Sequence, residues 1–141
     1  MHTLTGKLSL ISTAAAAAAM IRAALPKEQK EERVFVLPLD AHGKVLAKPI
    51  LVSVGHQDGT AAIDAGAIFR EALKAGAEEI IVAHNHPSGD LTPSKADIAA
   101  TKELKDLGKR LNVDLLDHII IGDCKSSTEE GFKSLAELSL I

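Results

Sequence analysis

Tryptophan and tyrosine are absent from this chain of 141 residues, and three phenylalanines are its only aromatic side chains of the Phe, Trp and Tyr type. Proteins that bind single-stranded nucleic acids commonly stack the bases on such side chains, so the composition argues against that function. The formal net charge of −3 likewise provides no general positive field for a nucleic acid. A local basic patch is still compatible with these numbers.

Cysteine and long apolar runs are also scarce. The single cysteine, Cys124, has no second thiol in the chain with which to form a disulfide, which fits a reducing compartment, and we expect a cytoplasmic protein. No apolar run approaches the roughly 18 residues that a membrane-spanning helix needs, so no membrane association is expected.

The composition that is present, 46% hydrophobic and 25% charged residues, is typical of a globular protein, and the length predicts a single domain. The Ala-rich segment 8–20 follows Lys7 and has the small residues of a signal-peptide cleavage site. We favour the alternative, a helix capped by Ser12 or Thr13 and stopped by Pro26. The expected organisation is an N-terminal helix and connector over residues 1–30, followed by one domain over residues 31–141.

Hydrophobic patterns and turn residues predict an α/β fold with a mixed, largely antiparallel sheet flanked by helices. The expected elements after the first helix are strands over 34–39 and 45–54, a helix capped by Asp58 or Thr60 and ending near 75, a strand over 79–84, a helix opened by Thr92 and Pro93, a strand over 113–121 and a short strand over 132–135.

The stretch HNHPSGDLTPSKAD, residues 84–97, carries the chemistry. His84 and His86 lie two positions apart at a strand end, so both imidazoles can point to the same face. With Asp97 they offer the ligand types that Zn²⁺ prefers, and three protein ligands leave a position for water, as in catalytic sites. A Cys-rich structural zinc site is excluded because the chain has one cysteine. A pair of histidines alone, however, arises by chance in many strands.

The full string is more specific, because seven residues separate His86 from Ser94 and two separate Ser94 from Asp97. This pattern resembles that of the JAMM metallopeptidases, also called MPN-plus or JAB proteins, and most closely their RadC branch. The segments 34–46, 69–90, 116–123 and 132–137 also look like RadC segments, so the resemblance covers about residues 32–141. It implies a single JAB/MPN domain, with a fold like that of cytidine deaminases.

The resemblance also implies roles for individual residues. His84, His86 and Asp97 are expected to bind one Zn²⁺ per chain, and Ser94 to stabilise the oxyanion that forms when water attacks the substrate. The family places a catalytic glutamate at the start of the strand that leads into Leu39-Asp40-Ala41; this selects Glu32, with Glu31 as the near alternative. Glu32 would take a proton from the attacking water and pass it to the leaving amine.

The leading hypothesis is therefore a zinc-dependent hydrolase of peptide or isopeptide bonds, a JAMM-type metalloprotease with a peptide or protein as its partner. The alternatives are a DNA repair-associated accessory protein of the RadC type, and a non-catalytic MPN scaffold, whose relatives generally lack some of the ligands. A homo-oligomer is compatible with each of these hypotheses. The chain departs from RadC proteins in having Ile63–Ala67 in place of a His-Pro-Arg-Glu-like segment. We expect His118 to be a strand residue that supports the metal ligands.

Overall fold

A computed structural model of the protein describes residues 13–28, 30–55, 63–122 and 131–141. The expected caps Ser12, Asp58 and Thr60, and also Cys124, lie outside these residues. In chain order the elements are α2 (Ala14–Ala24), β1 (Arg33–Leu39), β2 (Ile50–Val54), α3 (Ala65–Lys74), β3 (Glu79–Asn85), α4 (Lys95–Leu111), β4 (Asp114–Ile121) and β5 (Phe132–Ser134).

The strands form one five-stranded sheet in the order β2-β1-β3-β4-β5. Neighbouring strands are antiparallel except for β3 and β4, which are parallel. A parallel pair needs a crossover connection, and α4 supplies it. The predicted α/β fold with a mixed, largely antiparallel sheet is thereby confirmed. The crossover also brings the N-terminus of α4 to the end of the sheet where β3 stops.

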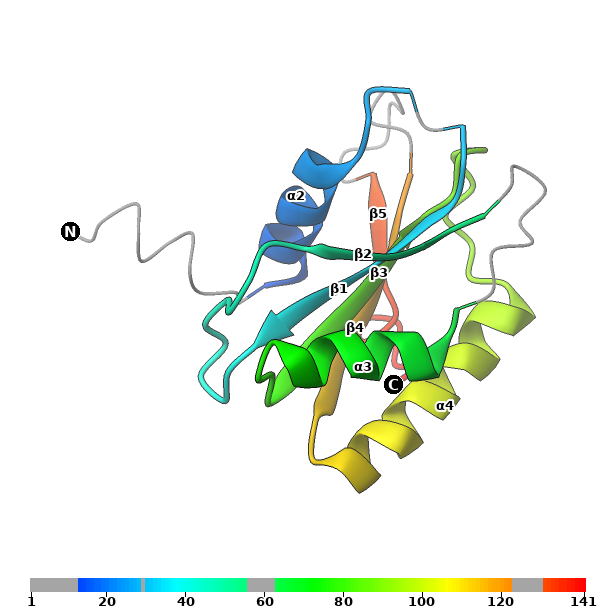
Figure 1. Cartoon of the computed structure of the whole chain (residues 1–141). Helices are drawn as coiled ribbons and strands as arrows, with labels where there is room; N and C mark the ends of the chain where they lie inside the picture. Colours follow the sequence, from blue (N-terminus) through cyan, green and yellow to red (C-terminus); the bar gives the residue numbers. More distant parts are fainter. Residues whose placement is uncertain (1–12, 29, 56–62, 123–130) are drawn as a thin grey trace.

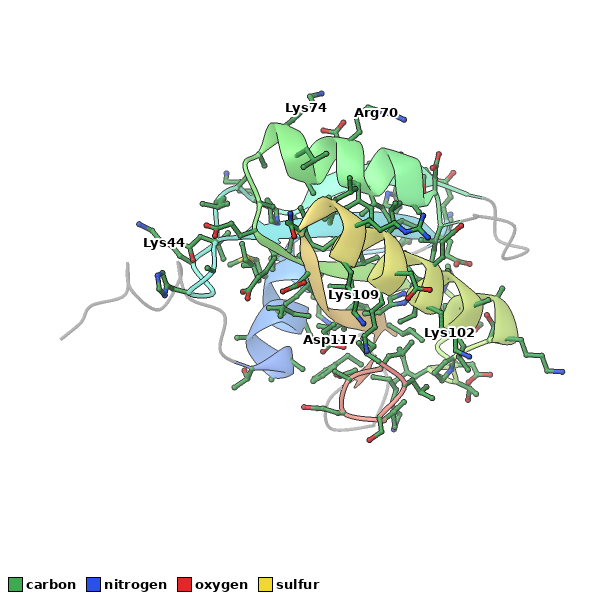
Figure 2. The ribbon with its side chains drawn as sticks, turned by 90° about the horizontal axis from the view of Figure 1, so that it is seen from below. Lys44, Arg70, Lys74, Lys102, Lys109 and Asp117 are labelled. Carbon is green, nitrogen blue, oxygen red and sulfur yellow. The ribbon has the colours of Figure 1, made fainter. Side chains whose placement is uncertain are left out.

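Helices cover both faces of the sheet, with α2 on one side and α3 and α4 on the other (Figure 1). Alternate side chains of β1 point to opposite faces of the sheet. Phe35, Leu37 and Leu39 pack with α2, whereas Val34 and Val36 pack with α3. On the outer side of α3, Arg70 and Lys74 point away from the sheet (Figure 2). Two apolar layers therefore bury the central strands and fix which way their side chains face.

The first described helix, α2, begins after Thr13, whose side chain accepts a hydrogen bond from the backbone N–H of Ala16. This confirms Thr13 as a cap, and Pro26 follows shortly after the C-cap residue Leu25. Ala17, Ala18 and Ile21 are buried against the sheet. Residues 14–24 thus form a packed helix, as the favoured alternative predicted. None of the helices in the described ranges is long and apolar enough to cross a membrane.

Three expected details were wrong. The helix α4 is capped by Ser94 and begins at Lys95, two residues after Pro93, because Ser94 and Asp97 form a capping box. The second strand is limited to Ile50–Val54, and Val45 makes only an isolated bridge to Leu39. The helix α3 begins at Ala65 and not after Asp58 or Thr60, because Asp64 is its N-cap and accepts the backbone N–H of Ala67.

Gly108 provides a test of how α4 packs against the start of β4. A Cβ atom at this position would lie 2.3 Å from the backbone oxygen of Val113, which cannot move aside independently. We expect Gly108→Ala to lower the free energy of unfolding by about 1–3 kcal/mol, as overpacking does.

The matched control is Gly66→Ala, near the start of α3, where the nearest non-neighbouring atom would be 3.4 Å from the added Cβ. Alanine has the higher helix propensity, so this variant should be as stable as wild type or more stable by up to about 1 kcal/mol. Urea unfolding of both variants measures the difference. Equal stabilities for the two would show that the close approach at Gly108 relaxes freely.

Candidate metal centre

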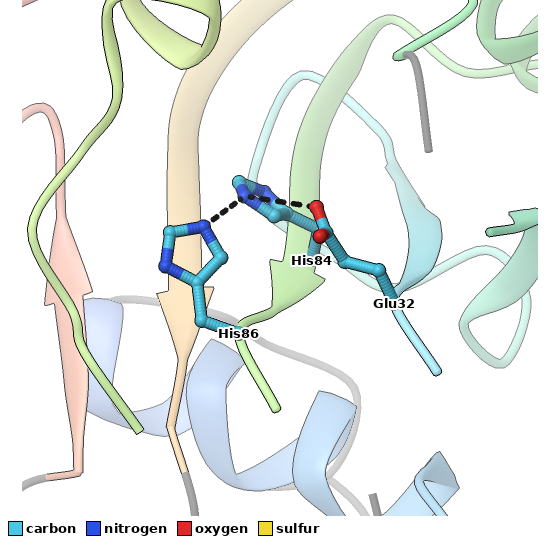
Figure 3. A group of neighbouring side chains, drawn as sticks. All are labelled: Glu32, His84 and His86. Atoms are coloured by element: carbon cyan, nitrogen blue, oxygen red, sulfur yellow. Dashed lines mark hydrogen bonds and ion pairs between the residues drawn. The ribbon is translucent and has the colours of Figure 1, made fainter. Parts of the chain in front are cut away.

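Four polar side chains meet where β3 ends, beside the start of β1 and the first turn of α4. They are Glu32, His84, His86 and Asp97. His84 and His86 are alternate residues of a strand end, and their rings come together as the sequence predicted (Figure 3). Glu32 reaches the same place because β1 and β3 are antiparallel, with Val34 opposite His84. The crossover to α4 supplies Asp97.

The polar atoms of this cluster are closely spaced. The Nε2 atoms of His84 and His86 lie 2.9 Å apart. Asp97 places Oδ1 at 3.3 Å from the Nε2 of His84 and Oδ2 at 3.4 Å from the Nε2 of His86. The Oε1 atom of Glu32 is 4.0 Å from the Nε2 of His84. All four side chains therefore direct their polar atoms to one point.

These separations suit a divalent metal ion. Tetrahedral ligands at about 2.0–2.2 Å from Zn²⁺ lie about 3.3–3.6 Å from one another, close to the distances between Asp97 and the two imidazoles. Glu32, His84 and His86 each offer a ligand atom, and these atoms all lie within 4.8 Å of one another. The nitrogen and oxygen donors are of the kind that zinc takes in catalytic sites.

A capping box holds Asp97 in place. Its Oδ2 accepts the backbone N–H of Ser94 at 2.9 Å, and the Ser94 hydroxyl accepts the backbone N–H of Asp97 at 3.0 Å. The carboxylate also lies at the positive end of the α4 dipole, which favours its charged form. Ser94 thus has a structural role as the N-cap. Its hydroxyl oxygen accepts the N–H of Asp97, so the hydroxyl proton is not used in the capping box.

The side chain of Asn85, between the two histidines, fixes the backbone around Glu32. Its Oδ1 accepts the N–H of Arg33 at 2.6 Å, and its Nδ2 donates to the carbonyl of Glu31 at 3.0 Å. Glu32 is 9% exposed and faces the cluster, whereas Glu31 forms an ion pair with Arg33 at 3.4 Å. The structure therefore brings Glu32, and not Glu31, next to the histidines.

The outer nitrogens of both imidazoles have partners inside the protein. The Nδ1 of His86 lies 2.6 Å from the carbonyl oxygen of Asp90. The Nδ1 of His84 lies 2.8 Å from the Nε2 of His118, whose own Nδ1 lies 2.7 Å from the hydroxyl oxygen of Thr101. Both ring nitrogens of His118 are engaged in this way, so it supports His84 as expected and is not placed as a ligand.

The burial of the cluster alters the ionisation of its members. Burial alone raises the pKa of Asp97, but the adjacent imidazoles of His84 and His86 outweigh it and hold that pKa far below its usual range. The adjacent carboxylate of Asp97 raises the pKa of His86. Burial raises the pKa of Glu32, against the opposing effect of the two histidines. Burial lowers the pKa of His118 to about 3, so this imidazole is neutral near pH 7.

The structure thus brings together Glu32, His84, His86 and Asp97, with Ser94 at the adjoining helix start. The sequence alone did not predict the hydrogen-bonding roles of Asn85 and Thr101. Asn85 had a weak signal, since a buried amide in an apolar strand needs polar partners. Thr101 also had a signal, since it lies on the buried face of α4 with Leu104, four residues after Asp97, where a hydroxyl needs a polar partner.

The chain is similar to a family of known proteins. The family model of the RadC-like JAB domain matches residues 11–139. A UPF0758 protein of Methanosarcina mazei is 41% identical over 108 residues, which are 75% of this chain and 46% of the relative. A UPF0758 protein of Carboxydothermus hydrogenoformans is 46% identical over 97 residues, 69% of this chain and 42% of the relative.

A third UPF0758 protein, from Thermosynechococcus vestitus, is 40% identical over 118 residues, which are 84% of this chain and 46% of the relative. The chain therefore spans a little under half the length of these curated relatives. With a family match over nearly all of its residues, this chain belongs to the RadC-like JAB domain family.

Proposed function

We propose that this protein is a zinc-dependent hydrolase of peptide or isopeptide bonds. The observation that carries the proposal is the convergence of two imidazoles and two carboxylates at the end of β3. His84, His86 and Asp97 would hold the metal, and Glu32 would remain free for proton transfer. Membership of the JAB family supports the same class of chemistry.

When bound at such a site, zinc lowers the pKa of a coordinated water to about 7 and polarises the substrate carbonyl. The protein supplies the remaining steps. Glu32 accepts a proton from the attacking water and delivers it to the leaving amine, as a positioned general base and acid. The hydroxyl of Ser94 donates a hydrogen bond to the oxyanion that forms at the substrate carbonyl.

The burial of Glu32 and Asp97 favours this arrangement over a solvated acidic surface, because both carboxylates have lost most of their contact with water. Such a loss is unfavourable unless a positive partner compensates for it. The imidazoles of His84 and His86 lie beside these carboxylates, and a divalent cation bound among them would provide compensating positive charge. A non-catalytic scaffold has no need to bury a second carboxylate beside three ligands.

The test begins with metal content. We expect the purified protein, supplied with zinc and then desalted, to hold one zinc per chain by elemental analysis. His86→Ala should hold much less, because one of the three assigned ligands is lost. His42→Ala is the matched control, since His42 is exposed in the turn after β1 and should bind zinc normally.

The second arm is hydrolysis, measured on a panel of peptides and ubiquitin-like fusions. Cleavage should stop on addition of a chelator and return with zinc. Normal zinc content in His86→Ala would disprove the assigned site, and cleavage that resists the chelator would disprove the assigned chemistry.

A further inference from the structure

A hydrogen-bonded chain leads from the proposed metal site into the protein interior. The Nδ1 of His84 is 2.8 Å from the Nε2 of His118, and the Nδ1 of His118 is 2.7 Å from the Oγ1 of Thr101. The Thr101 hydroxyl also lies 2.8 Å from the backbone oxygen of Asp97, to which it donates. His84 and His118 are fully buried and Thr101 is 1% exposed, so water does not compete for these bonds.

The direction of the hydrogen bonds decides which nitrogen of His84 is free. A neutral imidazole carries one N–H and one lone pair. If Thr101 donates to Asp97, its oxygen accepts the Nδ1–H of His118. The Nε2 of His118 then accepts the Nδ1–H of His84, and the Nε2 of His84 presents a lone pair to the cluster. If the chain runs the other way, the Nε2 of His84 carries a proton and cannot bind a metal.

The tautomer of His86 is determined by a single hydrogen bond. Its Nδ1 faces the backbone oxygen of Asp90, which only accepts hydrogen bonds, so the proton must lie on Nδ1. His84 faces another histidine instead, which can accept or donate. The tautomer of His84 therefore depends on Thr101, the last residue of this series of hydrogen bonds.

Thr101 can accept a hydrogen bond from His118 because its own hydroxyl proton is donated to the backbone oxygen of Asp97. The backbone oxygen of Asp97 lies four residues earlier on the same helix, and the carboxylate of that residue is in the metal site. One side chain thus connects the orientation of His84 with the turn of α4 that carries Asp97. An apolar residue of the same shape would preserve the packing but lose this acceptor.

We propose that Thr101 and His118 are positioning residues that hold His84 in its Nδ1–H tautomer and so make its Nε2 a metal ligand. This inference rests on the metal site of the proposed function but does not depend on hydrolysis. Partners of this kind, which orient a ligating histidine, typically change metal affinity by about 10- to 100-fold when removed.

The experiment compares Thr101→Val with Thr101→Ser in the whole protein. Valine matches the shape of threonine and lacks the hydroxyl, whereas serine keeps it. Competition with a chromophoric chelator should give zinc binding about 10- to 100-fold weaker in Thr101→Val and a change of less than about tenfold in Thr101→Ser. Wild-type affinity in Thr101→Val would overturn the inference, as would an equal loss in both variants.

Nitrogen-15 NMR of the imidazoles supplies a readout that a merely structural role would not move. In the zinc-loaded wild-type protein the protons of His84 and His118 should both lie on Nδ1. A proton on the Nε2 of His118 would overturn the inference even if Thr101→Val failed to fold. Failure of the wild-type protein to bind zinc would instead refute the proposed function along with it, whereas normal zinc binding without hydrolysis would leave the inference intact.

Discussion

Glu32→Gln is expected to retain zinc and to lose about 10²- to 10⁴-fold in kcat, the usual contribution of a positioned general base. Glutamine has the same size as glutamate and keeps a hydrogen-bonding oxygen, but its amide does not accept a proton at neutral pH. The carboxylate of Glu32 stands 4.0 Å from the Nε2 of His84, farther than either oxygen of Asp97 stands from its imidazole. We therefore assign it proton transfer and not a metal bond.

Glu31→Gln is the matched control, because it makes the same chemical change one residue earlier. Glu31 is exposed and pairs with Arg33, so its replacement should leave kcat and zinc content unchanged. Measurement of both quantities separates the possible roles of Glu32. Full activity in Glu32→Gln would reject the assignment, and loss of zinc in that variant would make Glu32 itself a ligand.

The sequence predicted the part of the site that is local along the chain. His84 and His86 follow the two-residue period of a strand; His84 lies in β3, His86 directly follows its last residue, and the two rings are in edge contact. Asp97 is separated from His86 by only a turn and the start of a helix, so few chain conformations would place it far from the histidines. The start of α4 was misplaced because Thr92-Pro93 and Ser94 are competing caps, and only the reciprocal bonds between Ser94 and Asp97 decide between them.

The rest of the site depends on contacts between distant parts of the sequence. Glu32 reaches the cluster through the antiparallel pairing of β1 with β3, and nothing in the spacing of acidic residues encodes that register. The resemblance to RadC proteins selected it. Thr101 and His118 meet because α4 crosses over to β4, and a periodic pattern cannot show which side chains of a helix and a strand will touch.

Asp97→Ala is expected to lower zinc affinity by more than about 100-fold, since removal of even an outer partner of a ligand costs about 10- to 100-fold. The change removes one of three assigned ligands and the only assigned negative charge. It also removes the acceptor for the Ser94 N–H, so the loss of the capping box should destabilise the fold by about 1 kcal/mol. Stability must therefore be measured alongside zinc binding.

Asp97→Asn separates these two effects. Asparagine keeps the volume and an oxygen that can accept the Ser94 N–H, but it has no charge to offer a cation and is a poor ligand for zinc. We expect Asp97→Asn to unfold near the wild-type urea concentration and yet to bind zinc weakly, like Asp97→Ala. If Asp97→Asn instead binds zinc with wild-type affinity, Asp97 acts as a helix cap alone, and Glu32 becomes the third ligand beside His84 and His86, which lie within 4.8 Å of it.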